Sequence, residues 1–94
     1  MASLHIEHPV TDLATWVEAF SGFAEIRKGA GVVAEQVRHP VGDDRYVVID
    51  LEFGSTEQAE SFLEFLRTQV WATPELSPAL DGQPEARVLE AVEI

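Results

Sequence analysis

The sequence predicts an α+β domain with the element order β-α-β-β-α-β. Each half of the chain has a strand pattern, an amphipathic helix pattern and a second strand pattern. The two halves meet at a tight turn, Val41-Gly42-Asp43-Asp44. The chain has 94 residues, of which 46% are hydrophobic, as in an ordinary globular protein with one modest core. We therefore expect residues 1–94 to form a single domain.

The first half begins with a strand over residues 3–8. Apolar and polar residues alternate there, so Leu4 and Ile6 share one face. Thr11 or Asp12 is placed to cap the helix that follows, because either side chain can accept hydrogen bonds from its first backbone N–H groups.

Apolar residues at i, i+3, i+4 and i+7 predict that this helix is amphipathic. They are Leu13, Trp16, Val17 and Phe20. Gly22 is the expected end of the helix. Residues 27–31 are rich in glycine and basic residues, which predicts a flexible connection before a second strand over residues 32–39. Arg27 and Lys28 could attract an anionic ligand there, although a solvated loop is the simpler interpretation.

The second half repeats the pattern more strongly. Residues 45–53 form the clearest strand, and alternate apolar residues line one of its faces: Val47, Ile49, Leu51 and Phe53. Ser55 and Gln58 have the spacing of a capping box. The next helix has an apolar stripe of Ala59, Phe62, Leu63, Leu66 and Val70. A last strand is expected over residues 86–92.

A proline-rich segment, residues 72–84, separates the second helix from the last strand. Thr73 followed by Pro74 predicts a short helical turn, because proline is well tolerated at the first position of a helix. We expect Leu76 and Leu80 to cover one end of the core. The segment could roof a pocket there, and its prolines favour a fixed roof over a moving one.

Two interleaved β-α-β units predict a four-stranded antiparallel sheet with both helices on one face, in the ferredoxin-like strand order 4-1-3-2. The other face is left open. It would hold His5, Glu7, Tyr46, Val48, Asp50 and Glu52, with either Leu89 and Ala91 or Val88 and Val92 from the last strand. Such a face can be solvated. Its mixture of apolar and charged residues favours packing against a second copy across a two-fold axis.

Four residues of the open face are candidates for chemistry: His5, Glu7, Asp50 and Glu52. They could form an acid–base pair, because crowding pushes the pKa values of neighbouring groups apart. They could also bind a divalent metal. The favoured interpretation is a hydrogen-bonded network in which Arg38 or Arg87 neutralises the carboxylates, so no metal site is predicted.

Composition excludes several classes of function. The net charge is −11 and the six basic residues are scattered, so no nucleic-acid partner is expected. The absence of cysteine excludes disulfides and cysteine nucleophiles. No segment is typical of a signal peptide or a membrane span, so we expect a cytoplasmic protein with no membrane partner. The Gly29-Ala30-Gly31 run lacks the helix of a phosphate loop, and no cofactor is predicted.

Two runs of the sequence carry a family resemblance. One is His5-Ile6-Glu7-His8-Pro9-Val10-Thr11-Asp12-Leu13, followed by Trp16 and Phe20. The other is Tyr46-Val47-Val48-Ile49-Asp50-Leu51-Glu52-Phe53, followed by Glu57, Ala59 and Phe62-Leu63. Together they resemble the dimeric α/β-barrel superfamily, nearest to small uncharacterised bacterial proteins akin to the antibiotic biosynthesis monooxygenase group. The resemblance implies a homodimer in which two sheets face each other, and a ligand pocket between each sheet and its helices.

The residues expected to line that pocket are His8, Trp16, Phe20, Phe62 and Trp71. The superfamily's cofactor-free monooxygenases use asparagine with tryptophan and arginine, and its haem-degrading members use a histidine on the second helix. This chain contains no asparagine, and no histidine follows His39. The resemblance therefore implies the fold and the pocket rather than either catalytic set.

Two function classes remain. One is a cofactor-free, oxygenase-like enzyme acting on a small apolar, aromatic or polyketide-like molecule. The other is a non-catalytic module for ligand binding or assembly. A pocket with room for a ring would favour the first, whereas an interior filled by Phe20, Phe23, Phe62 and Leu66 would exclude it.

Overall fold

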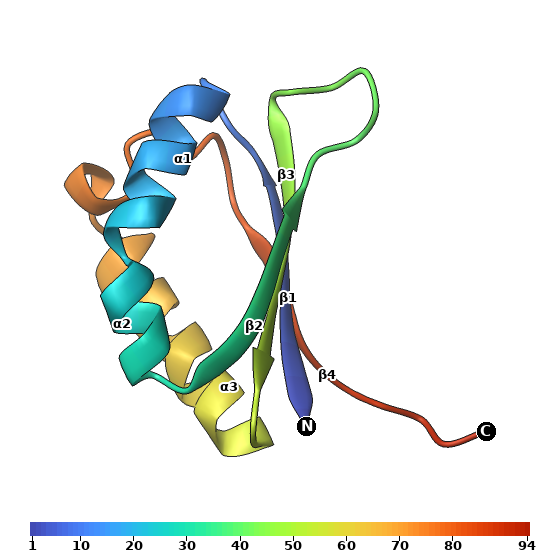
Figure 1. The fold of residues 1–94 in the computed structure, drawn as a ribbon. Coiled ribbons are helices and arrows are strands. Elements are labelled where there is room, and N and C mark those ends of the chain that lie inside the picture. Colours follow the sequence, from blue (N-terminus) through green and yellow to red (C-terminus); the bar gives the residue numbers. More distant parts are fainter.

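A four-stranded antiparallel sheet carries all the helices on one of its faces (Figure 1). The computed structural model covers residues 1–94. The strands are β1 (Ala2–Pro9), β2 (Val32–Arg38), β3 (Tyr46–Phe53) and β4 (Glu85–Glu90). Their spatial order is β2-β3-β1-β4, which is the predicted order read from the other edge. The ferredoxin-like fold class is therefore confirmed.

The helices all pack on the same side of the sheet (Figure 1). They are α1 (Leu13–Gly22), α2 (Ala24–Gly29) and α3 (Thr56–Phe65), which continues as a π-helical turn, η1 (Leu66–Val70). The predicted helical turn after Thr73 is the 3₁₀ helix η2 (Pro74–Leu76). None of these helices is both long and apolar enough to cross a membrane.

The flexible connection expected over residues 27–31 is wrong. Arg27, Lys28 and Gly29 form the second half of α2, and only Ala30 and Gly31 separate α2 from β2. α2 begins directly after Phe23. The Arg27 side chain is buried and lies over the Phe20 ring of α1. Gly31 has a φ of 103°, a conformation that glycine adopts readily, and it makes the turn into β2. The chain therefore turns at this one glycine and not over a five-residue loop.

The core lies between the sheet and the helices. The inner faces of β1 and β3 are buried at every residue expected there: Leu4, Ile6, Val47, Ile49, Leu51 and Phe53. Ala59, Phe62, Leu63 and Val70 are buried on the second helical stripe. Val17 is 45% exposed, so its place on the first stripe is wrong. On α1, Trp16 is buried, and Leu13 and Phe20 are half-buried beside it. The buried face of α1 is therefore narrower than the predicted stripe.

Each long helix begins at a side-chain cap. Asp12, rather than Thr11, caps α1, and its Oδ2 accepts from the backbone N–H of Thr15 at 2.9 Å. Ser55 caps α3 by accepting from the backbone N–H of Gln58 at 3.2 Å. In a capping box the Gln58 side chain would also bind the backbone N–H of Ser55. Here the Gln58 side chain lies against Gly31 instead.

The strand register decides which residues reach the open face. Leu89 pairs opposite Ser3, so it lies on the open face, whereas Val88 pairs opposite Leu4 in the core. The last strand ends at Glu90, and the final residues extend away from the sheet (Figure 1).

The loop after α3 covers its end of the core differently from the prediction. Leu76 is 41% exposed and Leu80 is half-buried, so the expected role of Leu76 as a core cover is wrong. Ala79 is buried in its place, because its carbonyl accepts the Thr11 backbone N–H at 2.9 Å and draws this loop onto the end of β1.

Candidate functional site

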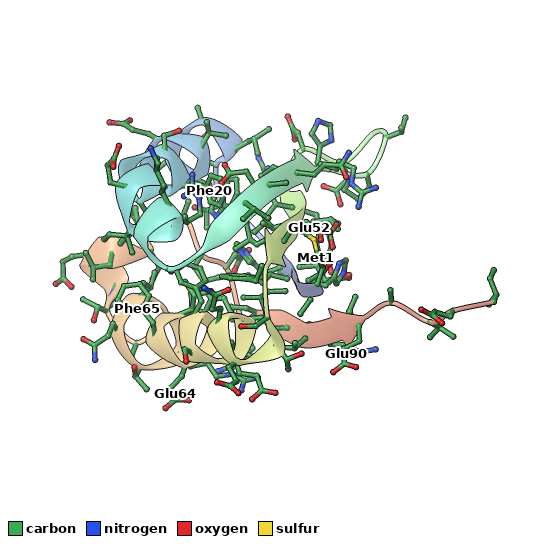
Figure 2. The ribbon with its side chains drawn as sticks, turned by 60° about the horizontal axis from the view of Figure 1, so that its bottom comes forward. Met1, Phe20, Glu52, Glu64, Phe65 and Glu90 are labelled. Carbon is green, nitrogen blue, oxygen red and sulfur yellow. The ribbon has the colours of Figure 1, made fainter.

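A cavity opens between the helices and the inner face of the sheet. The cavity volume is about 70 Å³, and all the empty space up to and including the open mouth is about 650 Å³. Fourteen of its 18 lining residues are hydrophobic. They come from β1, β3, all three α-helices, η1 and the loop after it. Figure 2 shows two of them, Phe20 on α1 and Phe65 on α3, on the helix side of the sheet.

All five residues expected in a pocket line this one cavity: His8, Trp16, Phe20, Phe62 and Trp71. Trp16 stacks on Phe20 with ring centroids 4.8 Å apart and planes inclined by 21°. Its ring also meets the His8 imidazole edge-on, at 6.1 Å. Aromatic residues thus wall the cavity without filling it.

His8 is the buried polar group of this wall. It is 3% exposed, and its Nδ1 lies 2.9 Å from the carbonyl oxygen of Pro9. A carbonyl can only accept, so Nδ1 carries the hydrogen and Nε2 is left as an unprotonated acceptor. Burial lowers the pKa of His8 from its usual 6.5, so the ring is neutral at pH 7.

Arg27 is a cavity residue whose burial the sequence reasoning missed. It is 5% exposed, and its guanidinium lies 3.7 Å from the centroid of the Phe20 ring. It donates to both carboxylate oxygens of Glu35, at 2.9 and 3.2 Å, and to the carbonyl of Phe20. Phe20, Phe23 and Arg27 are spaced i, i+3 and i+7 in the sequence, but the break at Phe23 between α1 and α2 means that this spacing does not by itself place them on one helix face.

A second cluster lies on the open face of the sheet, and we call it the sheet-face network. It joins Arg38, Asp50, His5, Glu7 and Tyr46 in that order. The His5 ring lies between two carboxylates, with Nδ1 2.7 Å from Asp50 Oδ1 and Nε2 2.8 Å from Glu7 Oε2. Arg38 donates to the second oxygen of Asp50 at 2.7 Å, and Tyr46 donates to the second oxygen of Glu7 at 2.7 Å.

Hydrogen bonds within the sheet-face network shift the pKa values of His5, Glu7 and Tyr46. Hydrogen bonds to Glu7 and then to Asp50 raise the pKa of His5, because they favour the imidazolium. The Tyr46 hydroxyl, and then His5, lower the pKa of Glu7. The pKa of Tyr46 is raised to about 12 by the same bond to Glu7. With the imidazolium of His5 between Glu7 and Asp50, and Arg38 beside Asp50, the two carboxylates of the network are paired with two cations.

The remaining sequence candidates lie outside this network. Glu52 accepts a hydrogen bond from Ser3 at 2.9 Å, and Figure 2 shows it away from the helices. Arg87 pairs opposite His5 in the sheet but forms no ion pair there. No group of three or more histidine, aspartate or glutamate side chains has the arrangement of a metal site. Both ring nitrogens of His5 already face carboxylates.

Comparison with known proteins shows similarity in fold. No protein-family model matches the sequence, and a search of curated proteins finds no relative. The fold is similar to that of SnoaB, a cofactor-independent oxygenase from Streptomyces nogalater, with a TM-score of 0.75, 14% identity, and coverage of 99% of this chain and 94% of that one.

Two further solved structures are similar. One is an antibiotic biosynthesis monooxygenase-type protein from Deinococcus radiodurans, with a TM-score of 0.73, 14% identity, and coverage of 100% of this chain and 95% of the other. The other is a dimeric ferredoxin-like protein from an uncultured marine organism, with a TM-score of 0.62, 12% identity, and coverage of 99% and 96%. The expected resemblance to the antibiotic biosynthesis monooxygenase group is thus confirmed in fold.

Proposed function

We propose that this protein binds a small, mainly apolar aromatic molecule in the cavity between its sheet and its helices. The observation that carries the proposal is the aromatic, largely hydrophobic cavity wall, which includes the His8 imidazole, whose Nε2 has no hydrogen-bond partner in the protein. Ligand sites are typically apolar with a few placed polar groups, as here.

The size of the cavity limits the ligand. Its volume of about 70 Å³ is smaller than that of an apolar cavity of about 150 Å³ that accepts benzene. A ligand must therefore also occupy the mouth or displace side chains at the rim. Leu76 is exposed there, so its side chain can be displaced more easily than that of Trp71, which is half-buried against the core. These volumes favour a single aromatic ring.

Chemistry of the kind that the name of SnoaB describes would need a base beside the bound molecule. His8 is the titratable base in the cavity wall, and the charge of Arg27 is already balanced by Glu35. A cofactor-free, oxygenase-like reaction would therefore rely on His8. The second candidate function, a non-catalytic ligand-binding module, is favoured because the wall holds no titratable side chain besides His8 and Arg27.

Binding can be tested with toluene and p-cresol, by calorimetry and by the fluorescence of Trp16 and Trp71. Ala19 lines the cavity, whereas Ala14 lies exposed on the same helix. We expect Ala19→Phe to abolish binding by filling the cavity, and Ala14→Phe to leave it unchanged. If neither compound binds the unmodified protein at millimolar concentration, the proposal is wrong.

We further propose that two copies associate through the open sheet face. This face combines half-buried Val48 and exposed Leu89 with the neutralised sheet-face network, and a similar fold is described as a dimer. Sedimentation should then give twice the monomer mass of 10.4 kDa. Val48→Glu should yield monomers, whereas Val41→Glu, in an exposed loop, should not. A single 10.4 kDa species at high micromolar concentration would contradict the dimer.

A further inference from the structure

We propose that residues 91–94 of each copy reach across to the partner copy and pack against the start of its β2. We call these residues the arm. This contact rests on the proposed association through the open sheet face, and it adds a second surface to that association.

The arm leaves its own apolar side chains uncovered. It follows β4 beyond Glu90 and extends away from the helices, on the open side of the sheet (Figure 1). Val92 is 82% exposed, and Ile94 is fully exposed. Leu89, which lies on the open face just before the arm, is also exposed. These side chains therefore continue the face on which the second copy is proposed to lie.

A matching apolar position lies on the opposite edge of the sheet, at the same end. Val33 is 65% exposed and is the extra residue of a β-bulge at the start of β2. Ala2 of β1 pairs opposite both Phe53 and Glu90. Phe53 in turn pairs opposite Val32. The strand register thus places the start of β2 and the beginning of the arm on the two outer edges of one end of the sheet.

The symmetry of a face-to-face dimer can bring these two positions together. A two-fold axis parallel to the strands exchanges the edges of the sheet and keeps its ends, so each arm meets the exposed Val33 and Ala34 of the partner. An axis across the strands would instead bring the arm to exposed Glu85, where Glu93 would meet a like charge. The apolar match selects the first arrangement, in which the contact occurs twice.

The twist of the sheet favours the same arrangement. At this end β2 bends toward the helices, whereas β4 and the arm lead away from them (Figure 1). In two copies placed face to face, the partner's β2 therefore recedes where the arm projects. The arm would fill the space that the two twisted sheets leave at that corner.

The size of the open face also favours a further contact. Four strands about 4.8 Å apart and about seven residues long, at about 3.3 Å per residue, have a flat footprint of roughly 450 Å². A standard interface buries about 800 Å² on each partner. A four-residue arm from each copy, with the surface that it covers, brings the dimer closer to that size.

Disulfide trapping tests the contact directly, because the chain contains no cysteine of its own. When Val33→Cys and Val92→Cys proteins are mixed, allowed to exchange subunits and oxidised, we expect disulfide-linked pairs of chains on a non-reducing gel. Neither variant should link to itself, because the axis keeps the two arms on opposite edges. Val37→Cys mixed with Val92→Cys is the matched control and should not link. Val37 is exposed on the same strand, but it lies four residues further along and pairs opposite Ile49, on the helix side.

Charged substitutions test the energy of the contact. Val33→Lys and Val92→Glu should each weaken association by roughly tenfold or more in sedimentation, because each removes an apolar contact twice in the dimer. Both positions are exposed within one chain, so neither change should alter the stability of the monomer. An equimolar mixture should recover part of the affinity, since the introduced lysine of one chain then meets the introduced glutamate of the other.

The outcomes separate the arm contact from the dimer. Linking through Val37→Cys as readily as through Val33→Cys, self-linking of Val92→Cys, or unchanged affinity in both charged variants would overturn the arm contact and leave the sheet-face dimer standing. An unmodified protein that sediments only as a monomer would overturn the dimer itself, and the arm contact with it.

Discussion

Arg27 of α2 and Glu35 of β2 form a bidentate ion pair, with Arg27 Nε 2.9 Å from Glu35 Oε1 and Arg27 Nη2 3.2 Å from Glu35 Oε2. The arginine is buried, whereas the glutamate side chain is 40% exposed. The guanidinium also covers the Phe20 ring. The pair therefore ties a short helix to the edge strand of the sheet and closes one side of the cavity.

Arg27→Met should destabilise the protein, because it keeps much of the hydrophobic stem but removes every donor. We expect the free energy of unfolding to fall by about 2 kcal/mol, less than for a fully buried pair because Glu35 can regain water. Urea unfolding measures this change. Arg67→Met, at an exposed arginine, is the matched control and should change the stability by less than about 0.5 kcal/mol. Equal effects of the two substitutions would show that the ion pair contributes nothing.

The sequence could predict the faces of the sheet but not this helix. The period of two in residues 45–53 sets which side chains face the core, and those residues are all buried as predicted. The six residues of α2 are too few to show an apolar stripe. Arg27 is buried because Glu35 reaches it from the next strand, and that contact exists only once the chain has folded.

The candidate sites show the same limit. The alternation of side chains along β1 predicted that His8 faces the helices and that His5 and Glu7 lie on the open face, and the structure confirms this. It could not decide between Asp50 and Glu52 as the partner of His5. The strand register decides this, because His5 pairs opposite Asp50 and Ser3 opposite Glu52.

Gly31→Ala should destabilise the protein through both backbone and contact. Gly31 has a φ of 103°, which residues with a Cβ rarely adopt, and a Cβ there would lie 2.6 Å from Nε2 of Gln58. We expect a loss of about 1–2 kcal/mol in thermal or urea unfolding. Gly31→Ala combined with Gln58→Ala should recover only part of it, since the backbone strain persists. Full recovery would mean that the contact alone matters.

Gly29→Ala should have the opposite effect to Gly31→Ala and stabilise the protein. Gly29 ends α2, and a Cβ there would meet nothing within 4 Å. We expect a gain of about 0.4–1 kcal/mol in unfolding free energy, because alanine reduces the freedom of the unfolded chain. A loss of stability would contradict the placement of residue 29 in a helix.

Ser55→Ala should cost about 1 kcal/mol of stability, because the first turn of α3 would lose its capping acceptor for the Gln58 N–H. The loss should appear as a lower urea midpoint with an unchanged slope. Ser61→Ala, at an exposed position within the same helix, should be neutral or slightly stabilising, since alanine favours helix. If both variants lose the same stability, the cap is not the cause.

The sheet-face network should make stability depend on pH through His5. Hydrogen bonds to Glu7 and to Asp50 raise its pKa above 6.5, so the folded protein binds the imidazole proton more tightly than the unfolded chain does. The stabilisation is fully present below pH 6.5, and it is lost as the pH rises through the raised, folded-state value. The pKa of Glu7 is lowered, so this carboxylate remains ionised across the same range.

His5→Gln removes this titration while keeping a polar side chain on the open face. The difference in unfolding free energy between the unmodified protein and His5→Gln should therefore be larger at pH 6 than at pH 9. Burial lowers the pKa of His8, which gives that residue the opposite pH dependence, but His8 is present in both proteins and cancels in the difference. His39→Gln, at an exposed histidine with no carboxylate partner, is the control. A difference as large at pH 9 as at pH 6 would show that His5 contributes through packing and not through its charge.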